Sequence, residues 1–340
     1  MDRVPVAGPV DLAGSLDVLR RSGDDLLDRW DGRVWLRSLT VDGAMVGAAA
    51  RPVGTVADPV LLVGAEAGAD PRAAGRALAA GFVTAPVARA ELAGADPVVA
   101  RIAARFPGVG PVLQPDLLTA VVRAITAQQI TLRFAAVLRG RLARRYGRRH
   151  LVPVGAVDTR GRPAPESATL PHRGAAPGAG SLEAGPAAEV WSLDAGRLAG
   201  AAVADLRELQ LSTSKAVATI AFAGAVAGGR VDLATLAGLD DEEVVQRLVA
   251  FPGIGRWTAE WLLARTLGRP LVVAGDLAVR KAVGAAYLDG RMPSEAEVRA
   301  VTAHWGPAAG VAQQLLLHWL SAETTGKRSA TRPGRSSRRG

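Results

Sequence analysis

The chain has 340 residues, of which 49% are hydrophobic and 4% aromatic, and its formal net charge at pH 7 is +9. It contains no cysteine, which excludes disulfides, thiolate zinc sites, cysteine-ligated iron–sulfur clusters and cysteine nucleophiles. Six basic residues and no acid lie in residues 324–340, so residues 1–323 carry only three of the nine net charges. A mildly basic body of this kind is compatible with DNA binding but does not require it.

Membrane and metal-binding classes are disfavoured. No apolar run reaches the roughly 18 residues that span a bilayer, and the first residues lack the apolar stretch of a signal peptide. We therefore expect a cytoplasmic protein with no membrane partner. We expect no metal site, because the spacing of the four histidines is not typical of metal ligands. They are His150, His172, His304 and His318.

Residues 1–112 are expected to form a small domain of mixed α and β structure. The run 17–30 is typical of a helix, with Gly23 as a weak point. Residues 34–39 and 60–64 favour strands, and turn signals separate the strand-like pieces.

Residues 113–322 are predicted to be almost entirely helical, with a break near 128–131. Residues 152–188 are rich in Pro, Gly, Ala and Ser and have no hydrophobic period, which predicts a mobile surface insertion. Residues 323–340 are expected to form a basic, disordered tail, either attracting phosphates or only aiding solubility.

The most informative segment is a predicted helix–hairpin–helix at 242–267. A helical run meets the sequence Phe-Pro-Gly-Ile-Gly, and a second helix starts near Arg256. Gly253 and Gly255 permit backbone conformations and close approaches that side chains forbid. The unpaired N–H groups at the start of the second helix, together with its dipole, favour an anion such as a phosphate. A tight helix–helix turn without a ligand is the alternative.

The string PGIGRWTAEW, followed by VVAGDLAVRKA, resembles the helix–hairpin–helix DNA glycosylases with a Gly/Pro-rich loop and an aspartate. Within them the chain is similar to the AlkA-type DNA-3-methyladenine glycosylase II branch. The segments AVVRAITAQQIT, LRELQLSTSKA and RVWLRSL extend the resemblance over most of the chain. It implies an α+β fold, with a small N-terminal antiparallel-sheet domain followed by a mostly helical glycosylase region. Gln210 replaces a usual glycine, and Ala309 stands where arginine is common.

The resemblance implies that Asp276 is catalytic. A carboxylate stabilises the positive charge that develops on the sugar and can orient or deprotonate water. Asp276 could instead only cap the helix that follows it. Family members that also cut the strand use a lysine, but here Trp257 occupies that position. We therefore expect a monofunctional enzyme that leaves an abasic site.

The resemblance also implies contacts with the flipped base and with DNA. Trp257 and Trp261, four residues apart on one helix face, would line a pocket for a cationic alkylated purine, with Trp305 flanking it. The expected DNA contacts are a wedge side chain, Gln129, and four hairpin residues: Gly253, Ile254, Gly255 and Thr258. Carbonyls of the hairpin could also hold a monovalent cation. For Gln129, helix capping is the alternative role, and for the tryptophans it is core packing. We expect no other cofactor, damaged double-stranded DNA as partner, and a monomer.

The leading hypothesis is therefore a base-excision-repair glycosylase that releases purines of the 3-methyladenine and 7-methylguanine type. A glycosylase for another lesion, such as a deaminated purine, is one alternative. A non-catalytic helix–hairpin–helix DNA-binding protein is another, and retention of Asp276 counts against it.

Overall fold

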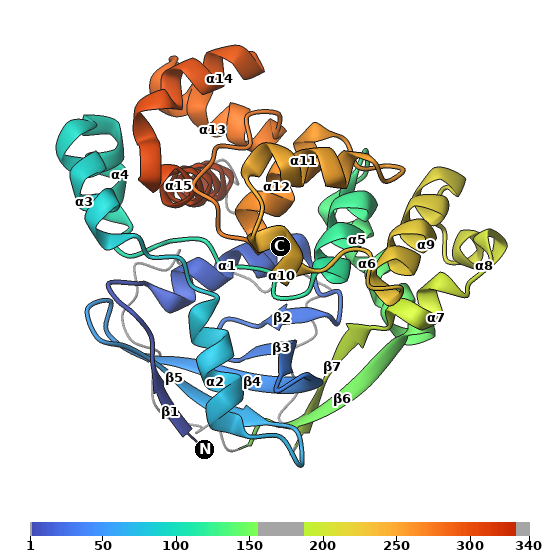
Figure 1. The fold of residues 1–340 in the computed structure, drawn as a ribbon. Helices are drawn as coiled ribbons and strands as arrows, with labels where there is room; N and C mark the ends of the chain where they lie inside the picture. Colours follow the sequence, from blue (N-terminus) through green and yellow to red (C-terminus); the bar gives the residue numbers. More distant parts are fainter. Residues whose placement is uncertain (1, 156–186, 331–340) are drawn as a thin grey trace, which may run out of the picture.

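The computed structural model describes residues 2–155 and 187–330. A sheet-based region carries a larger body of helices (Figure 1), which confirms the expected α+β class. Most of the predicted insertion and residues 331–340 of the predicted tail lie outside the described residues. Across the described part, no helix combines the length and apolar character needed to cross a membrane.

The N-terminal sheet is antiparallel with strand order β1-β5-β4-β3-β2. Asp42 and Gly43, with φ of 48° and 78°, form the tight turn that joins the third and fourth strands, as an Asp-Gly pair favours. One side packs on the two nearest helices around Trp35, which is fully buried. The elements are β1 (Asp2–Pro5), α1 (Leu12–Ser22), β2 (Asp28–Trp30), β3 (Trp35–Val41), β4 (Ala44–Gly54), β5 (Pro59–Ala65) and α2 (Pro71–Ala80).

The helix expected at 17–30 is wrong in its bounds. α1 begins earlier, where Asp11 caps it, and ends before Gly23, whose φ of 85° suits a glycine. Residues 28–30 instead form the edge strand β2. Trp30 and Asp17 are linked across this break by a 3.1 Å hydrogen bond from the indole Nε1.

The domain boundary expected at 112 also needs correction. Two helices before that position, α3 (Pro86–Ala95) and α4 (Pro97–Arg105), pack on the C-terminal helices rather than on the sheet. Phe106 stacks edge-on against His318, with ring centroids 4.9 Å apart. Apolar faces of both segments therefore share one core, although more than 150 residues separate them in sequence.

A two-stranded ribbon was missed by the sequence analysis. β6 (Gly147–Pro153) pairs antiparallel with β7 (Ala187–Leu193), so both ends of the predicted insertion are ordered strands. The ribbon packs on the first sheet through Val152 and Val190. It lies so close to β4 that a Cβ atom on Gly47 would be 2.6 Å from the Cβ of His150.

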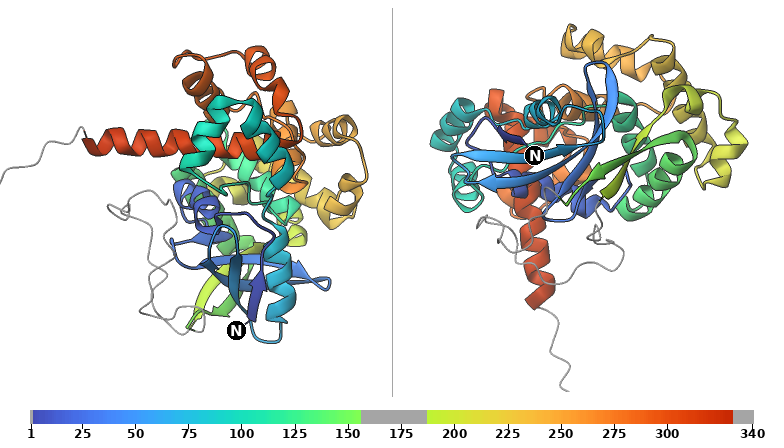
Figure 2. Two further views of the ribbon diagram at one scale, coloured as in Figure 1. Left: turned by 90° about the vertical axis from the view of Figure 1, so that its left-hand side faces the viewer. Right: turned by 90° about the horizontal axis from the view of Figure 1, so that it is seen from below.

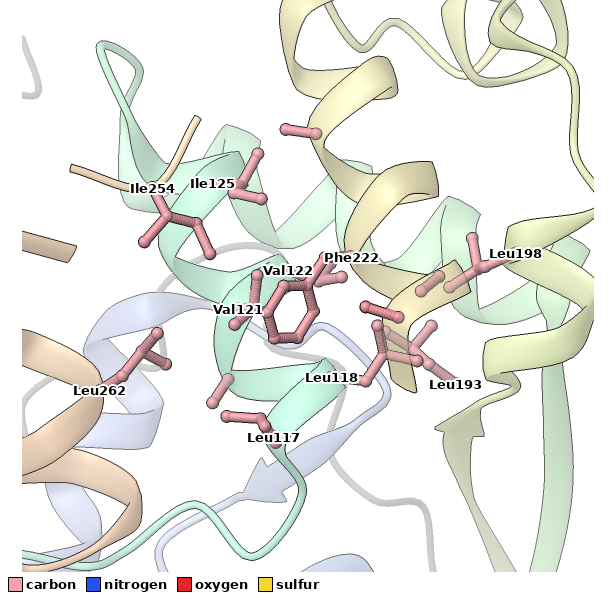
Figure 3. Close-up of a cluster of buried hydrophobic side chains, with 14 of the residues drawn as sticks. Leu117, Leu118, Val121, Val122, Ile125, Leu193, Leu198, Phe222, Ile254 and Leu262 are labelled. Atoms are coloured by element: carbon pink, nitrogen blue, oxygen red, sulfur yellow. The ribbon is translucent and has the colours of Figure 1, made fainter. Parts of the chain in front are cut away.

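The helical body surrounds α5 (Leu117–Ala127), which is buried on nearly every side. Figure 3 shows its apolar side chains meeting Phe222, Ile254 and Leu262 from other helices. The remaining helices are α6 (Leu132–Tyr146), α7 (Ala195–Ala199), α8 (Val203–Glu208), α9 (Thr213–Ala227), α10 (Leu233–Ala237), α11 (Asp241–Val249), α12 (Arg256–Thr266), α13 (Leu277–Tyr287), α14 (Glu295–Thr302), the 3-10 helix η1 (Ala303–Ala308) and α15 (Ala309–Ala330).

The expected tail boundary at 323 is wrong, because α15 continues to Ala330 and projects from the body (Figure 2). Glu323 pairs with Arg105 of α4. The Thr324 and Thr325 hydroxyls donate to the carbonyls four residues earlier, at 2.8 and 2.9 Å. These contacts continue the helix past the point where the apolar pattern ends.

Candidate active site and DNA interface

The predicted hairpin is present as α11, a short turn and α12. Gly253 adopts a φ of +75°, and a Cβ atom there would lie 2.8 Å from the Cβ of Ala218 on α9. Both the conformation and the close approach therefore require glycine. Gly255 is exposed, and a Cβ atom on it would meet nothing within 4 Å.

The start of α12 has no side-chain cap. Gly255 is its N-cap residue and offers no acceptor for the first N–H groups of the helix. Many other helices here begin with an Asp, Ser or Thr side chain that accepts such a bond, as at Asp116 and Ser212. The open N–H groups and the positive end of the helix dipole can therefore bind an anion at the surface.

Asp276 lies at the start of α13 and caps it. Its Oδ1 accepts hydrogen bonds from the backbone N–H groups of Ala278 and Val279, at 2.7 and 3.2 Å. The residue is half-buried. Both of these bonds end on Oδ1, so the capping role and a role for Oδ2 towards a ligand are compatible.

Arg265, on α12, is a site residue that the sequence analysis missed. Burial lowers the pKa of Arg265, and the negative charge of Asp276 opposes that shift, so the two groups interact electrostatically. The guanidinium is held by Gln314 of α15, to which Nη2 donates at 2.8 Å. The spacing of Trp257, Trp261 and Arg265 at four-residue intervals could have shown that they share one face.

The three predicted pocket tryptophans occupy different environments. Trp257 is half-buried and packs on Gly275, whose Cβ position would be 3.0 Å from the Trp257 Cδ1. Trp257 therefore lies beside the residue that precedes Asp276 in the chain. Trp261 is also half-buried and packs against the helical core. Trp305 departs from the prediction: it is 1% exposed inside the apolar cluster of α4, α13 and α15.

The burial of Trp305 has a local cause. Its ring lies 6.2 Å from that of Tyr287, and Gly306 follows with a φ of 49°, which turns the chain into α15. The indole therefore packs inside the core and cannot flank a base in this conformation. Ala309, at the position where the family often has arginine, is 5% exposed in the same cluster.

Two predicted DNA contacts are also corrected by burial. Ile254 is 4% exposed, and its side chain points into the helical core (Figure 3). Thr258 is 1% exposed, so its hydroxyl is not presented beside the two glycines. The anion-binding capacity of the hairpin therefore rests on backbone groups.

The predicted wedge residue occupies the turn between α5 and α6. Gln129 is exposed, and its φ of 59° is in the left-handed region that non-glycine residues seldom adopt. Strained, exposed positions of this kind are enriched at functional sites. The neighbouring Gln128 donates from Nε2 to the Gly253 carbonyl at 3.0 Å, so the turn and the hairpin touch.

Comparisons with known proteins agree with this arrangement. No family model matches the chain. A Mycobacterium tuberculosis protein, named as a bifunctional transcriptional activator/DNA repair enzyme AlkA, is 31% identical over 70% of the chain and 40% of its own length. A Bacillus subtilis protein, named as the DNA-3-methyladenine glycosylase YfjP, is 32% identical over 35% of the chain and 41% of its own length. The chain thus spans about two fifths of these relatives.

Solved structures share the fold over nearly the whole chain. The 3-methyladenine DNA-glycosylase from Archaeoglobus fulgidus matches with a TM-score of 0.72 and 22% identity, covering 96% of this chain and 99% of that one. An 8-oxoguanine glycosylase/lyase from Clostridium acetobutylicum, in complex with DNA, matches with a TM-score of 0.64 and 13% identity, over 95% and 99%. At these identities the likeness concerns the fold. Together with the sequence relatives and the hairpin–aspartate geometry, this shared fold supports an assignment to the helix–hairpin–helix DNA glycosylases of the AlkA type.

Proposed function

We propose that this protein is a monofunctional DNA glycosylase that removes alkylated purines from damaged DNA. The observation that carries the proposal is the position of Asp276, next to Trp257 and Arg265 and directly after an uncapped hairpin helix. The names of the sequence relatives support the substrate class. One lesion occupies one such site, so the active species is a monomer.

The hairpin holds the DNA backbone in this mechanism. A phosphate oxygen accepts hydrogen bonds from the N–H groups at the start of α12, which is exposed and has no side-chain cap. Gln129 enters the duplex from the adjacent turn and fills the space of the flipped nucleotide. Both groups act on the same stretch of DNA because Gln128 joins their turns.

Asp276 supports the bond cleavage. The C1′–N bond breaks, and its electron pair leaves with the base, which neutralises an alkylated purine cation. The carboxylate stabilises the positive charge that develops on the sugar. A water oxygen then bonds to C1′ and gives its proton to Asp276 or to solvent. The products are a free base and an abasic site.

The base stands beside the half-buried faces of Trp257 and Trp261. An aromatic face attracts a cation more strongly when water is displaced, which favours N3- or N7-alkylated purines over neutral ones. Because a cationic base is already a good leaving group, a tolerant pocket is sufficient. Several methylated purines are therefore substrates.

Neither Lys215 nor Lys281, the lysines whose side chains the structure describes, is proposed to open the sugar by covalent attack. Trp257 occupies the position of the family's nucleophilic lysine, and the ammonium of Lys215 is engaged by two backbone carbonyls. Lys281 is exposed on α13, five residues beyond Asp276. Water is therefore the nucleophile, and the strand stays intact.

The test is base release from DNA treated with dimethyl sulfate, resolved by chromatography. We expect the wild-type protein to release 3-methyladenine and 7-methylguanine and to leave uncut abasic DNA. Asp276→Asn is the matched control, because asparagine also caps helices. Release of a deaminated base instead would reassign the lesion. Binding without release of any base would point to a DNA-binding module.

A further inference from the structure

The turn between α5 and α6 needs a structural support, because Gln129 stands at its tip in a left-handed conformation. A non-glycine residue in this region persists only where its surroundings hold it. A side chain that enters a duplex must also resist the restacking of the bases that it separates. The contacts around this turn show what holds it.

Lys215, on α9, reaches the end of α5. Its Nζ donates to the carbonyls of Thr126 and Gln128, at 3.1 and 2.6 Å. Carbonyls at a helix C-terminus lack partners within the helix and carry the negative end of its dipole, so they suit an ammonium. Lys215 is half-buried, and this partial withdrawal from water lowers the pKa of its ammonium group. The two charge-assisted bonds compensate for that loss.

The same turn is fixed from two other sides. Gln128 donates to the Gly253 carbonyl of the hairpin at 3.0 Å. Arg139 of α6 donates from Nη1 to the Thr126 hydroxyl at 3.2 Å, and from Nε to Asp25 at 2.7 Å. The end of α5 is thereby tied to α9, to the hairpin and to the N-terminal region.

Helix α9 also touches the hairpin itself. Ala218 lies one turn after Lys215, and it is the residue that leaves no room for a Cβ atom on Gly253. One face of α9 therefore contacts both the wedge turn and the hairpin. A movement of either would have to break a hydrogen bond or open this contact.

We propose that Lys215 is a positioning residue that, together with Gln128, locks the Gln129 turn to the hairpin, so that both engage the DNA as one rigid unit. This inference rests on the proposed function, because it assigns Gln129 to the gap left by the flipped nucleotide. Lys215 acts through the turn and makes no contact with the reacting atoms.

The experiment uses the full chain and a duplex with a tetrahydrofuran abasic analogue beside 2-aminopurine, a base whose fluorescence rises when it loses stacking. The analogue has no base to release, so the signal does not depend on catalysis. We expect wild type to raise the fluorescence. Lys215→Met should lose most of that rise and bind about tenfold more weakly, as the loss of charge-assisted hydrogen bonds implies. Lys215→Arg should retain part of both.

Two controls separate positioning from general effects. Lys281→Met removes the same charge from an exposed position of α13 and should behave like wild type. In a Gln129→Gly background, which removes the wedge and tolerates the positive φ, Lys215→Met should cause no further loss. Equal loss in both backgrounds would overturn the inference, as would wild-type fluorescence from Lys215→Met.

If Lys215→Met does not fold, Gln128→Ala tests the same lock, because it removes the bond to the Gly253 carbonyl. A normal fluorescence rise from that variant would count against the inference. The two proposals fail separately. Unstacking by wild type without base release from methylated DNA would sink only the proposed function. Base release with unstacking that is insensitive to Lys215 would sink only the lock, and no binding of the abasic duplex would sink both.

Discussion

Helices α12 and α13 follow each other in the chain but begin in opposite ways. α12 starts at Gly255 with no side-chain cap, so its N–H groups are open to a ligand. α13 starts at Asp276, whose carboxylate already accepts hydrogen bonds from two backbone N–H groups. The start of α12 can therefore attract an anion, whereas the start of α13 already holds the carboxylate of Asp276. In the proposed function, a DNA phosphate binds at the start of α12, and Asp276 at the start of α13 stabilises the positive charge that develops on the sugar.

The comparison teaches that an N-cap aspartate alone is not a site. Asp116 also caps α5, but burial raises the pKa of its carboxyl group. Asp96 caps α4 and is held by Tyr287 and His304. Asp276 differs because Trp257 and Arg265 lie beside it.

The largest expected effect comes from neutralising the cap of α13. Asp276→Asn should lower base release about a thousandfold, the range expected for loss of a catalytic acid–base group. Binding to abasic DNA should remain, since the hairpin is unchanged. Single-turnover release and a binding titration measure the two. Near-wild-type release would show that Asp276 is only a cap.

Giving α12 the cap that α13 has should remove the difference between the two helix starts. Gly255→Asp places a carboxylate over the open N–H groups, and there is room for it. We expect about tenfold weaker DNA binding and a salt dependence shallower by about one phosphate contact. Stability should rise by a few tenths of a kcal/mol.

Gly255→Ala is the matched control for that change, because it adds a Cβ atom without a charge. It should bind DNA nearly as well as wild type, because it removes no N–H group. DNA titrations of both variants at several salt concentrations separate the effect of the added charge from the effect of the added volume. Equal weakening by both would mean that the phosphate needs the bare glycine rather than the open helix start.

Arg265 is the cation whose protonated form the charge of Asp276 favours, so its removal tests whether the pair matters for base release. Arg265→Met should reduce base release by about tenfold, the scale of one charge-assisted interaction. Arg265→Lys should recover part of the loss. Arg101→Met, on the exposed face of α4, is the charge-matched control and should leave release unchanged. Unchanged base release by Arg265→Met would show that Arg265 does not contribute to the site, which would then consist of Asp276 and the aromatic rings.

The smallest effect on activity is expected at Asp96, a cap without a site. Burial alone would raise the pKa of Asp96, but hydrogen bonds from Tyr287, His304 and the α4 backbone lower it overall. Its stabilisation is therefore present above the unfolded-state pKa and is lost as pH falls through the folded-state pKa. Asp96→Ala should lower stability at neutral pH by about 1 kcal/mol, and this difference should shrink in acid. Thermal melting at several pH values, with base release as the second readout, checks both.

Much of the site could be predicted because its signals are local. The turn needs Gly253 for a positive φ and a close contact, and Asp276 begins a helix within the same short segment. For the same reason the two hairpin helices, Asp241–Val249 and Arg256–Thr266, lie close to the predicted range 242–267. Propensities, caps and turn residues act over a few positions, so they are visible without the fold.

The roles of the tryptophans could not be predicted this way. Both tryptophans were expected at the base pocket, yet their environments differ. Trp257 is half-buried beside Gly275, whereas Trp305 is only 1% exposed. The ribbon of β6 and β7 was missed because each strand is short and is stabilised by a partner on the far side of the insertion. The partners of Arg265 and Lys215 come from other helices as well.

Local conformation and motif spacing encode the α+β class, the hairpin with its two glycines, the family resemblance and the candidate aspartate, so the residues alone are enough to predict them. The accessibility of the aromatic rings, the interaction of Arg265 with Asp276 and the hydrogen bond from Lys215 to the Gln128 carbonyl arise only when the chain folds. Burial and charge pairing depend on how distant segments pack together. Periodicity along one helix shows which face is apolar, but not which residues meet it.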